Sequence, residues 1–152
     1  MATLMGRRLR ALVFVAGVLA ALTGCREVRV KSYASGITRA PGGNQIVVVR
    51  NERELERLGI RSSVRFNHEF GVVLMMGPHD TTGWRQVIES IHAEVGHVQI
   101  VAYERGALDG GESTYSYRTF TLWIVPNSVY RSGAVVDVVT PSNEYVTSTV
   151  LR

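Results

Sequence analysis

The histidine and cysteine side chains that could hold a zinc ion in this chain are His68, His79, His92, His97 and Cys25. A zinc site needs three or four ligands in a suitable geometry, and a helical H-E-x-x-H motif is a common source of two of them. His68 is followed by Glu69, but no second histidine stands at that spacing. The sequence therefore predicts neither a metal site nor a cofactor.

An acid–base pair could form between His79 and Asp80, with Ser113 or Thr114 as a nucleophile. Hydrolases of the G-x-S-x-G type present the nucleophile on a tight turn, and this pattern is absent from the chain. Residues 80–83 (Asp-Thr-Thr-Gly) are explained more simply as a turn held by its own side chains. We therefore predict that the protein is not an enzyme.

Cys25 follows a segment that is typical of an export signal. Three arginines at positions 7, 8 and 10 precede an apolar run over residues 11–22, and Thr23 and Gly24 precede the cysteine. A basic start, an apolar stretch and small residues at a cleavage site define a secretory signal peptide. A membrane-spanning helix would need about 20 apolar residues, so this run predicts a cleaved leader instead.

The four residues Leu22-Thr23-Gly24-Cys25 resemble the lipobox of bacterial lipoproteins. The resemblance implies removal of residues 1–24 and attachment of acyl chains such as palmitate to Cys25. Several acyl chains, at about 0.8 kcal/mol per buried CH2 group, hold a protein stably on a membrane. Arg26 follows the cysteine where an aspartate would imply retention at the inner membrane, so we expect the periplasmic face of the outer membrane in a Gram-negative cell. The alternative is a cleaved leader that leaves Cys25 free.

The remaining 128 residues are enough for one domain. Their net charge indicates which partners to expect. Three of the 17 basic residues and none of the 13 acidic ones lie in residues 1–24, so the rest of the chain has a charge near +1. Nucleic-acid binding depends on many basic contacts to phosphates. We therefore expect no nucleic-acid partner.

Local patterns predict one helix and several strands. Asn51 can cap a helix from Glu52 to Leu58, with Glu54 completing a capping box and Gly59 ending it. Alternating apolar residues predict a strand over 115–125, with Trp123 on one face and Phe120 on the other. Further strands are predicted over residues 44–50, 64–66, 70–76, 98–103 and 134–139, with a short one possible over 27–32. Residues 77–83 are predicted to form a loop, because they combine glycine, proline and threonine.

Residues 84–95 fit two structures. Trp84, Val87, Ile88, Ile91 and Val95 have the spacing of an amphipathic helix. A strand with a bulge is the alternative, because one extra residue would return Ile88 and Ile91 to the same face.

Three segments resemble the central pattern of PrcB-type domains, which are named for an accessory subunit of a surface protease complex. They are 66–70 (Phe-Asn-His-Glu-Phe), 72–77 (Val-Val-Leu-Met-Met-Gly) and 81–84 (Thr-Thr-Gly-Trp), where the family has Thr-Gly-Gly-Tyr. Residues 51–58 resemble its helical segment, and Ser116-Tyr117 resembles the start of its late strand. The resemblance implies a strand over 84–92, no catalytic residue, and an envelope protein or protease as the partner.

We expect an α+β fold, mainly an antiparallel sheet forming a sandwich or open barrel, with one short helix. The expected organisation is a signal peptide (1–24), a lipidated tether (25–43), a β-rich domain (44–140) and a loosely ordered tail (141–152). Aromatic residues near a loop can anchor a partner. The candidate interaction residues are therefore His79, Thr81, Thr82, Gly83 and Trp84, although packing in the core is favoured for Trp84.

The expected function is that of a non-catalytic, lipid-anchored interaction or accessory module of the cell envelope. The alternative is a module that binds a small ligand, with residues 77–83 at the mouth of its site, and an envelope hydrolase is a third possibility. A deep pocket with converging polar groups would favour a ligand, and a flat aromatic patch would favour a protein partner.

Overall fold

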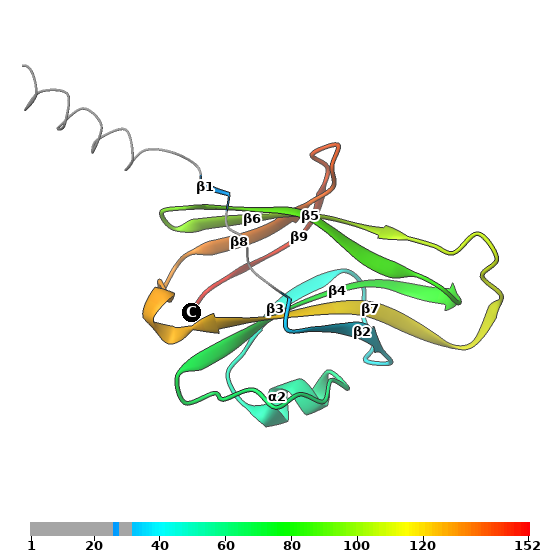
Figure 1. Cartoon of the computed structure of the whole chain (residues 1–152), viewed down its shortest axis with the longest axis horizontal. Coiled ribbons are helices and arrows are strands. Elements are labelled where there is room, and N and C mark those ends of the chain that lie inside the picture. Colours follow the sequence, from blue (N-terminus) through cyan, green and yellow to red (C-terminus); the bar gives the residue numbers. More distant parts are fainter. Residues whose placement is uncertain (1–25, 28–31) are drawn as a thin grey trace, which may run out of the picture.

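Two β-sheets packed face to face form the body of the molecule, and one helix covers the outer face of one sheet (Figure 1). The computed structural model describes residues 26–27 and 32–152, so the predicted signal peptide and Cys25 lie outside the described residues. The elements are β1 (Arg26–Glu27), β2 (Ala34–Thr38), β3 (Gln45–Val49), α2 (Glu52–Arg57), β4 (Glu69–Thr81), β5 (Arg85–Glu94), β6 (His97–Arg105), β7 (Glu112–Pro126), η1 (Asn127–Val129), β8 (Val135–Val139) and β9 (Tyr145–Val150).

The strand order is β1-β5-β6-β8-β9 in the first sheet and β2-β7-β4-β3 in the second. The strand pairs are antiparallel except β6 and β8, which are parallel. The predicted α+β class with a mainly antiparallel sheet is confirmed in its sandwich form. No helix within the described part of the chain is long and apolar enough to cross a membrane.

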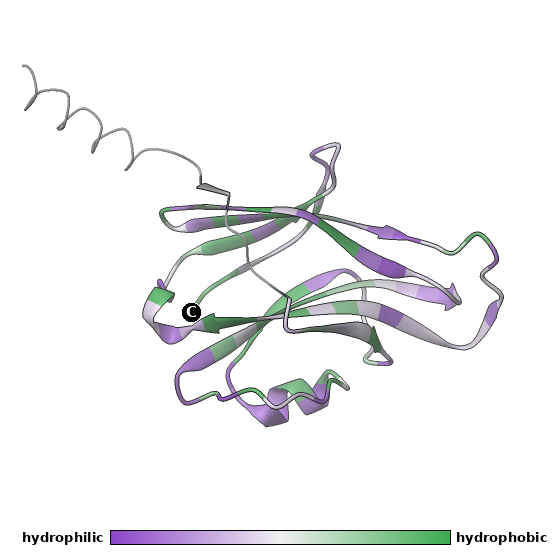
Figure 2. Ribbon diagram, viewed as in Figure 1, coloured by the Kyte–Doolittle hydropathy of each residue, from purple (hydrophilic) through white to green (hydrophobic). Residues whose placement is uncertain are grey.

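The predicted alternation along β7 is confirmed, and each face of this strand contributes to a different core. Trp123 and Val125 belong to the core between the two sheets. Phe120, Leu122 and Ile124 face the other way, into a second core under α2. Figure 2 shows apolar residues concentrated on the strands, whereas α2 is largely hydrophilic, which fits its single buried residue, Leu55.

The predicted helix and its cap are confirmed. The side chain of Asn51 accepts a hydrogen bond from the backbone N–H of Glu54 at 3.0 Å. The carboxylate of Glu54 accepts one in return from the backbone N–H of Arg50 at 2.6 Å, one residue earlier than in a standard capping box. Gly59 then takes a positive φ of 67° and ends the helix as expected.

Residues 85–94 form a strand, as the family resemblance implied, and the helical alternative is wrong. β5 pairs with β6, and the register shifts between Ile88 and Ser90. This bulge places Ile88 and Ile91 against the same core between the sheets. A spacing of three residues that is typical of a helix therefore arises here from one extra residue in a strand.

The prediction of a loop over 77–83 is wrong for most of its length. β4 continues through Pro78 to Thr81, and its pairing with β7 shifts register on both sides of His79. Proline lacks a backbone donor and is accommodated in a strand at such irregularities. Only Thr82 to Trp84 remain as the turn between β4 and β5.

Three further expectations are corrected by the structure. Residues 64–66 form no strand and instead cover the second core, where Val64 and Phe66 pack beside α2. The predicted tether contains β2, which pairs with β7, and the predicted loose tail contains β9, which pairs with β8. Leu151, next to the C-terminus, is buried in the core between the sheets. The partner of β2 is distant in sequence, and β9 forms a hairpin with β8 from a segment rich in serine and threonine, so local polarity reveals neither strand.

Candidate functional site

The structure brings the predicted interaction residues together at the end of β4. The rings of His79 and Trp84 are stacked, with their centroids 4.4 Å apart and their planes within 8°. The indole N–H of Trp84 donates to Oγ1 of Thr81 at 2.8 Å. Thr82 is exposed and exchanges hydrogen bonds with Gly111. The cluster is thus held by contacts among its own members and the loop that follows β6.

His79 is not the exposed turn residue that the sequence suggested. Its Nε2 lies 2.7 Å from Oε1 of Glu104 on β6, and only 11% of the His79 side chain and 12% of the Glu104 side chain are exposed. The same carboxylate oxygen accepts a hydrogen bond from Oγ1 of Thr119 at 2.5 Å. His79 is therefore bonded to Glu104 in this structure, and the contact links the two sheets.

Trp84 is half-buried, which favours the packing alternative for this residue over an exposed anchor. One face of its ring lies on His79. A Cβ atom added at Gly106 would lie 3.4 Å from the indole ring, so the loop after β6 approaches it closely. Tyr115 is the exposed aromatic residue nearby, and its ring is covered by the guanidinium of Arg39 at 3.6 Å.

Arg118 is the most buried charged residue in the described part of the chain, and sequence reasoning gave it no role. Only 2% of it is exposed. Its Nε donates to the carbonyl of Ala40 and one terminal nitrogen donates to the carbonyl of Gly43, both at 2.9 Å. Burial lowers the pKa of the Arg118 guanidinium from its ordinary value. These bonds fix the connection between β2 and β3, which is a structural role.

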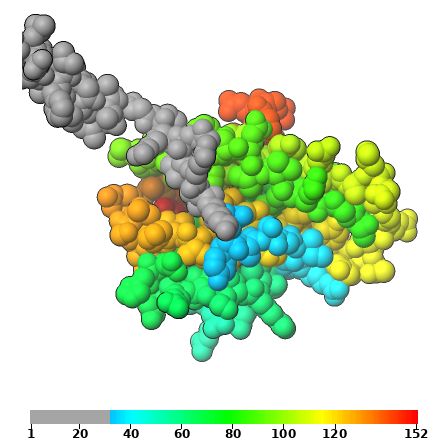
Figure 3. Space-filling model, in the orientation of Figure 1, coloured from blue at the N-terminus to red at the C-terminus, as the bar shows by residue number. Residues whose placement is uncertain are grey.

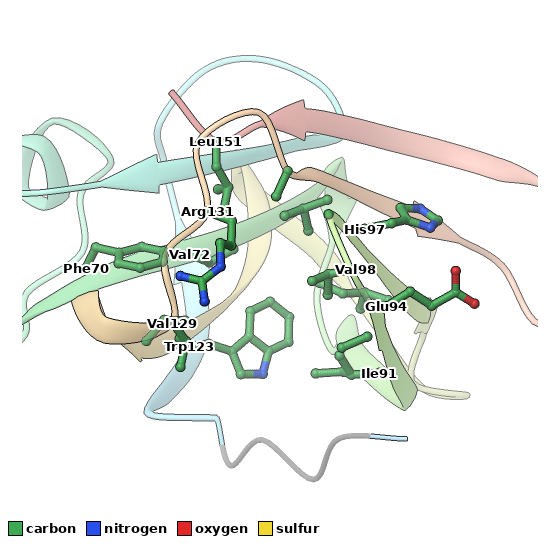
Figure 4. Close-up of a pocket in the computed structure, with 16 residues that line it drawn as sticks. Phe70, Val72, Ile91, Glu94, His97, Val98, Trp123, Val129, Arg131 and Leu151 are labelled. Carbon is green, nitrogen blue, oxygen red and sulfur yellow. The ribbon is translucent and has the colours of Figure 1, made fainter. Parts of the chain in front are cut away.

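A pocket of about 380 Å³ opens between the two sheets at the opposite end of the sandwich (Figure 4). Figures 1 and 3 show this end, with η1 and the β5–β6 turn, facing away from the loop that follows β6. Both sheets supply its apolar walls, chiefly Phe70, Val72, Ile91, Val98, Trp123 and Val136. Of the 16 lining residues, only Glu94, His97 and Arg131 carry an ionisable side chain.

Small residues and two turns leave this space open. Ala93, Gly96 and Ala134 line the pocket and project little or no side chain into it. Gly96 has a positive φ of 77°, which allows the tight turn from β5 to β6. On the other side, Tyr130 packs edge-on against Phe70 at 5.8 Å and holds the segment after η1 at the mouth.

The side chains of the three ionisable residues of the pocket point in different directions and differ in their hydrogen bonds. His97 is paired with Asp137, whose second oxygen accepts from Gln99 at 3.3 Å. Arg131 is exposed, and the one described hydrogen bond of its guanidinium runs to the carbonyl of Tyr130 at 3.1 Å. In Figure 4 the guanidinium of Arg131 points toward the space among Phe70, Val129 and Trp123. The carboxylate of Glu94 and the ring of His97 point away from that guanidinium.

Such a pocket is suited to binding an apolar molecule with a polar end at the mouth. The apolar lining offers water few hydrogen-bond partners. An apolar ligand that enters the pocket removes its own surface and that of the lining from solvent, which favours binding. Within residues 26–27 and 32–152, no group of three or more histidine, cysteine, aspartate or glutamate side chains could hold a metal ion.

The sequence placed most of these residues in predicted strands and did not indicate the pocket. Its walls come from five strands, η1, the connecting turns and Leu151 near the C-terminus, so no local spacing indicates it. The available signal was the small residues Ala93, Gly96 and Ala134 beside apolar strands, which is weak. Comparison of the chain with family models, with curated proteins and with solved structures finds no match. The geometry of the pocket and the motif around Cys25 are therefore the basis for a function.

Proposed function

We propose that this protein is a non-catalytic binding module of the bacterial cell envelope, anchored by acyl chains on Cys25, which holds a small apolar ligand between its two sheets. The pocket of about 380 Å³ carries the proposal. Sites for small molecules commonly measure about 300–1,000 Å³, are mostly apolar, and have a few polar groups that orient the ligand. This is the ligand-binding alternative from the sequence, with the site at the other end of the sandwich from residues 77–83.

The residue after the proposed anchor is paired with a strand that lines the pocket. Arg26, which is bonded directly to Cys25, pairs in β1 with Ala93, and Ala93 lines the pocket. Acyl chains on Cys25 would therefore hold the pocket end of the sandwich within a few residues of the membrane surface. The location in the envelope is inferred from the lipobox-like residues 22–25.

A second candidate is an accessory module that binds an extended segment of a protein partner. β2 is an edge strand, and Tyr33 and Ile37 beside and within it are each about half exposed. Edge strands with free backbone groups can pair with an added strand. The resemblance to PrcB-type domains agrees with this candidate, and both stay predictions.

Binding of an uncharged apolar probe tests the proposed function. The probe is hexadecanol, titrated below its solubility limit into residues 25–152 with Cys25→Ser, a span that contains the whole described sandwich. Ala93→Phe places a large side chain in the pocket, and we expect it to abolish binding. Ala107→Phe, at an exposed alanine beyond β6, is the matched control and should bind as the parent does. Equal binding by both variants, or none by the parent, would show that the pocket is not the site.

A further inference from the structure

We infer that the ligand of the inter-sheet pocket is a long-chain fatty acid, with its acyl chain between the sheets and its carboxylate on Arg131. The inference rests on the proposed function and deepens it, because it names the class of ligand. It depends on three features of the structure: the size and lining of the pocket, the direction of the charges at its mouth, and the place of the pocket relative to β1.

The interior of the pocket suits one acyl chain. Its volume of about 380 Å³ lies near the lower end of the range for small-molecule sites, which favours a single chain over the two chains of a membrane phospholipid. Ile91 and Val98 line it from one sheet, and Phe70 and Trp123 line it from the other. A flexible chain of CH2 groups can follow such a wall, which removes its apolar surface from water.

The mouth of the pocket suits an anion. Arg131 directs its guanidinium toward the apolar lining, among Phe70, Val129 and Trp123 (Figure 4). Two acidic groups lie nearby, but Asp137 is paired with His97 and Gln99, and the exposed carboxylate of Glu94 points away from Arg131. The charge that a ligand would meet at this point is therefore positive. A guanidinium matches the two oxygens of a carboxylate with parallel hydrogen bonds.

The position of β1 brings the pocket close to a source of such ligands. Arg26 pairs with Ala93, a lining residue, and Glu27 pairs with His92. With acyl chains on Cys25, the mouth would lie near the membrane, where free fatty acids partition. The membrane then supplies the ligand over a short distance, and the protein shields the acyl chain from water.

Titration calorimetry with a small set of ligands tests this inference on the same Cys25→Ser chain, at about pH 8, where a carboxylate is ionised. The ligands are palmitate, myristate, hexadecanol and a palmitoyl lysophospholipid, each below its micellar concentration. Palmitate should bind most tightly. Myristate, which is two CH2 groups shorter, should bind about fifteenfold more weakly, at about fourfold per CH2 group. Hexadecanol, which has the chain without the charge, should bind at least threefold more weakly than palmitate.

Arg131→Gln assigns the carboxylate site. It should weaken the binding of palmitate at least threefold and leave the binding of hexadecanol unchanged. The control Arg85→Gln, at an exposed arginine at the other end of the sandwich, should change the affinity for neither ligand. If palmitate and hexadecanol bind equally and Arg131→Gln affects neither, the fatty-acid assignment is overturned while the pocket remains a binding site. Tighter binding of the lysophospholipid than of palmitate would also overturn it. If no ligand binds, or Ala93→Phe changes nothing, the proposed function itself fails.

Discussion

His79 on β4 and Glu104 on β6 join the two sheets at the end of the sandwich opposite the pocket. Nε2 of His79 and Oε1 of Glu104 are 2.7 Å apart, and Trp84 stacks on the histidine ring. A polar group that is buried with a partner becomes costly when that partner is removed. The contact therefore stabilises the sandwich, and the predicted interaction residues around it take their positions from this packing.

His79→Ala should lower the free energy of unfolding by about 2 kcal/mol, because it leaves the Glu104 carboxylate with Thr119 as its remaining partner. Urea denaturation measures the change, with Asp80→Ala at an exposed neighbour as the control. A double-mutant cycle with Glu104→Gln isolates the pair. Additive effects of the two substitutions would show that His79 and Glu104 do not interact energetically.

Trp84→Ala should destabilise the fold by about 2–3 kcal/mol, which is less than the ~3–5 kcal/mol expected for a fully buried aromatic residue. The side chain is half-buried, and its loss removes the stack on His79 and the hydrogen bond to Thr81. Thermal melts provide the measurement, and Trp84→Phe, which keeps the stacking, should cost less than Trp84→Ala. Unchanged stability of Trp84→Ala together with the loss of a protein partner would restore the exposed-anchor interpretation.

Arg118→Met should cost about 3 kcal/mol, because it removes the donors that satisfy the carbonyls of Ala40 and Gly43. Burial lowers the pKa of Arg118, so its guanidinium would lose a proton at a lower pH in the folded chain than in the unfolded chain. The free energy of unfolding would therefore rise only as pH passes that lowered pKa. Arginine stays charged well above neutral pH. The cost of Arg118→Met, measured by urea denaturation, should therefore be constant between about pH 5 and pH 9. A cost that falls steadily across that range would contradict this account of the residue.

Lipid attachment to Cys25 predicts a simple result in cells. Metabolic labelling with a palmitate analogue should mark the wild-type chain and leave Cys25→Ala unlabelled, and Cys25→Ala should leave the membrane fraction. Ser35→Ala, on the edge strand β2, serves as a control and should be labelled like the wild type. If the Cys25→Ala protein stays in the membrane fraction and the wild-type protein is unlabelled, the lipoprotein hypothesis is wrong.

Elements that depend on local chemistry could be predicted from the sequence. The Asn51 cap requires residues within three positions of it, and the faces of β7 follow from alternation within one strand. The pairing of β2 with β7 joins distant segments, and β9 is a polar strand that forms a hairpin with β8. The sequence alone therefore predicts residues 34–38 and 145–150 to be parts of a tether and a tail. The family resemblance identified β5 as a strand, where residue spacing alone favoured a helix.

The pocket could not be predicted, because it is a property of packing rather than of any segment. Phe70, Ile91 and Trp123 have the pattern of ordinary core residues, and Leu151 lies in the segment predicted to be a tail. The space between these residues exists because Ala93 and Ala134 are small. Residues 79–84, the predicted interaction residues, lie close together, but His79 to Thr81 belong to β4 rather than to a loop. Their role in an interaction stays a prediction. His79 finds Glu104 across the sandwich, 25 positions later in the chain.

Quenching of tryptophan fluorescence by a brominated fatty acid tests the central claim most directly. The chain has two tryptophans, of which Trp123 lines the pocket and Trp84 lies at the opposite end. Bromine atoms quench an indole only at close contact. In the Trp84→Phe variant, whose one tryptophan is Trp123, dibromostearate should quench the fluorescence, and an excess of palmitate should prevent the quenching. Trp123→Phe, which reports on Trp84, should keep its fluorescence. Quenching of both variants to the same extent, or of neither, would contradict the assignment of the inter-sheet pocket as the binding site.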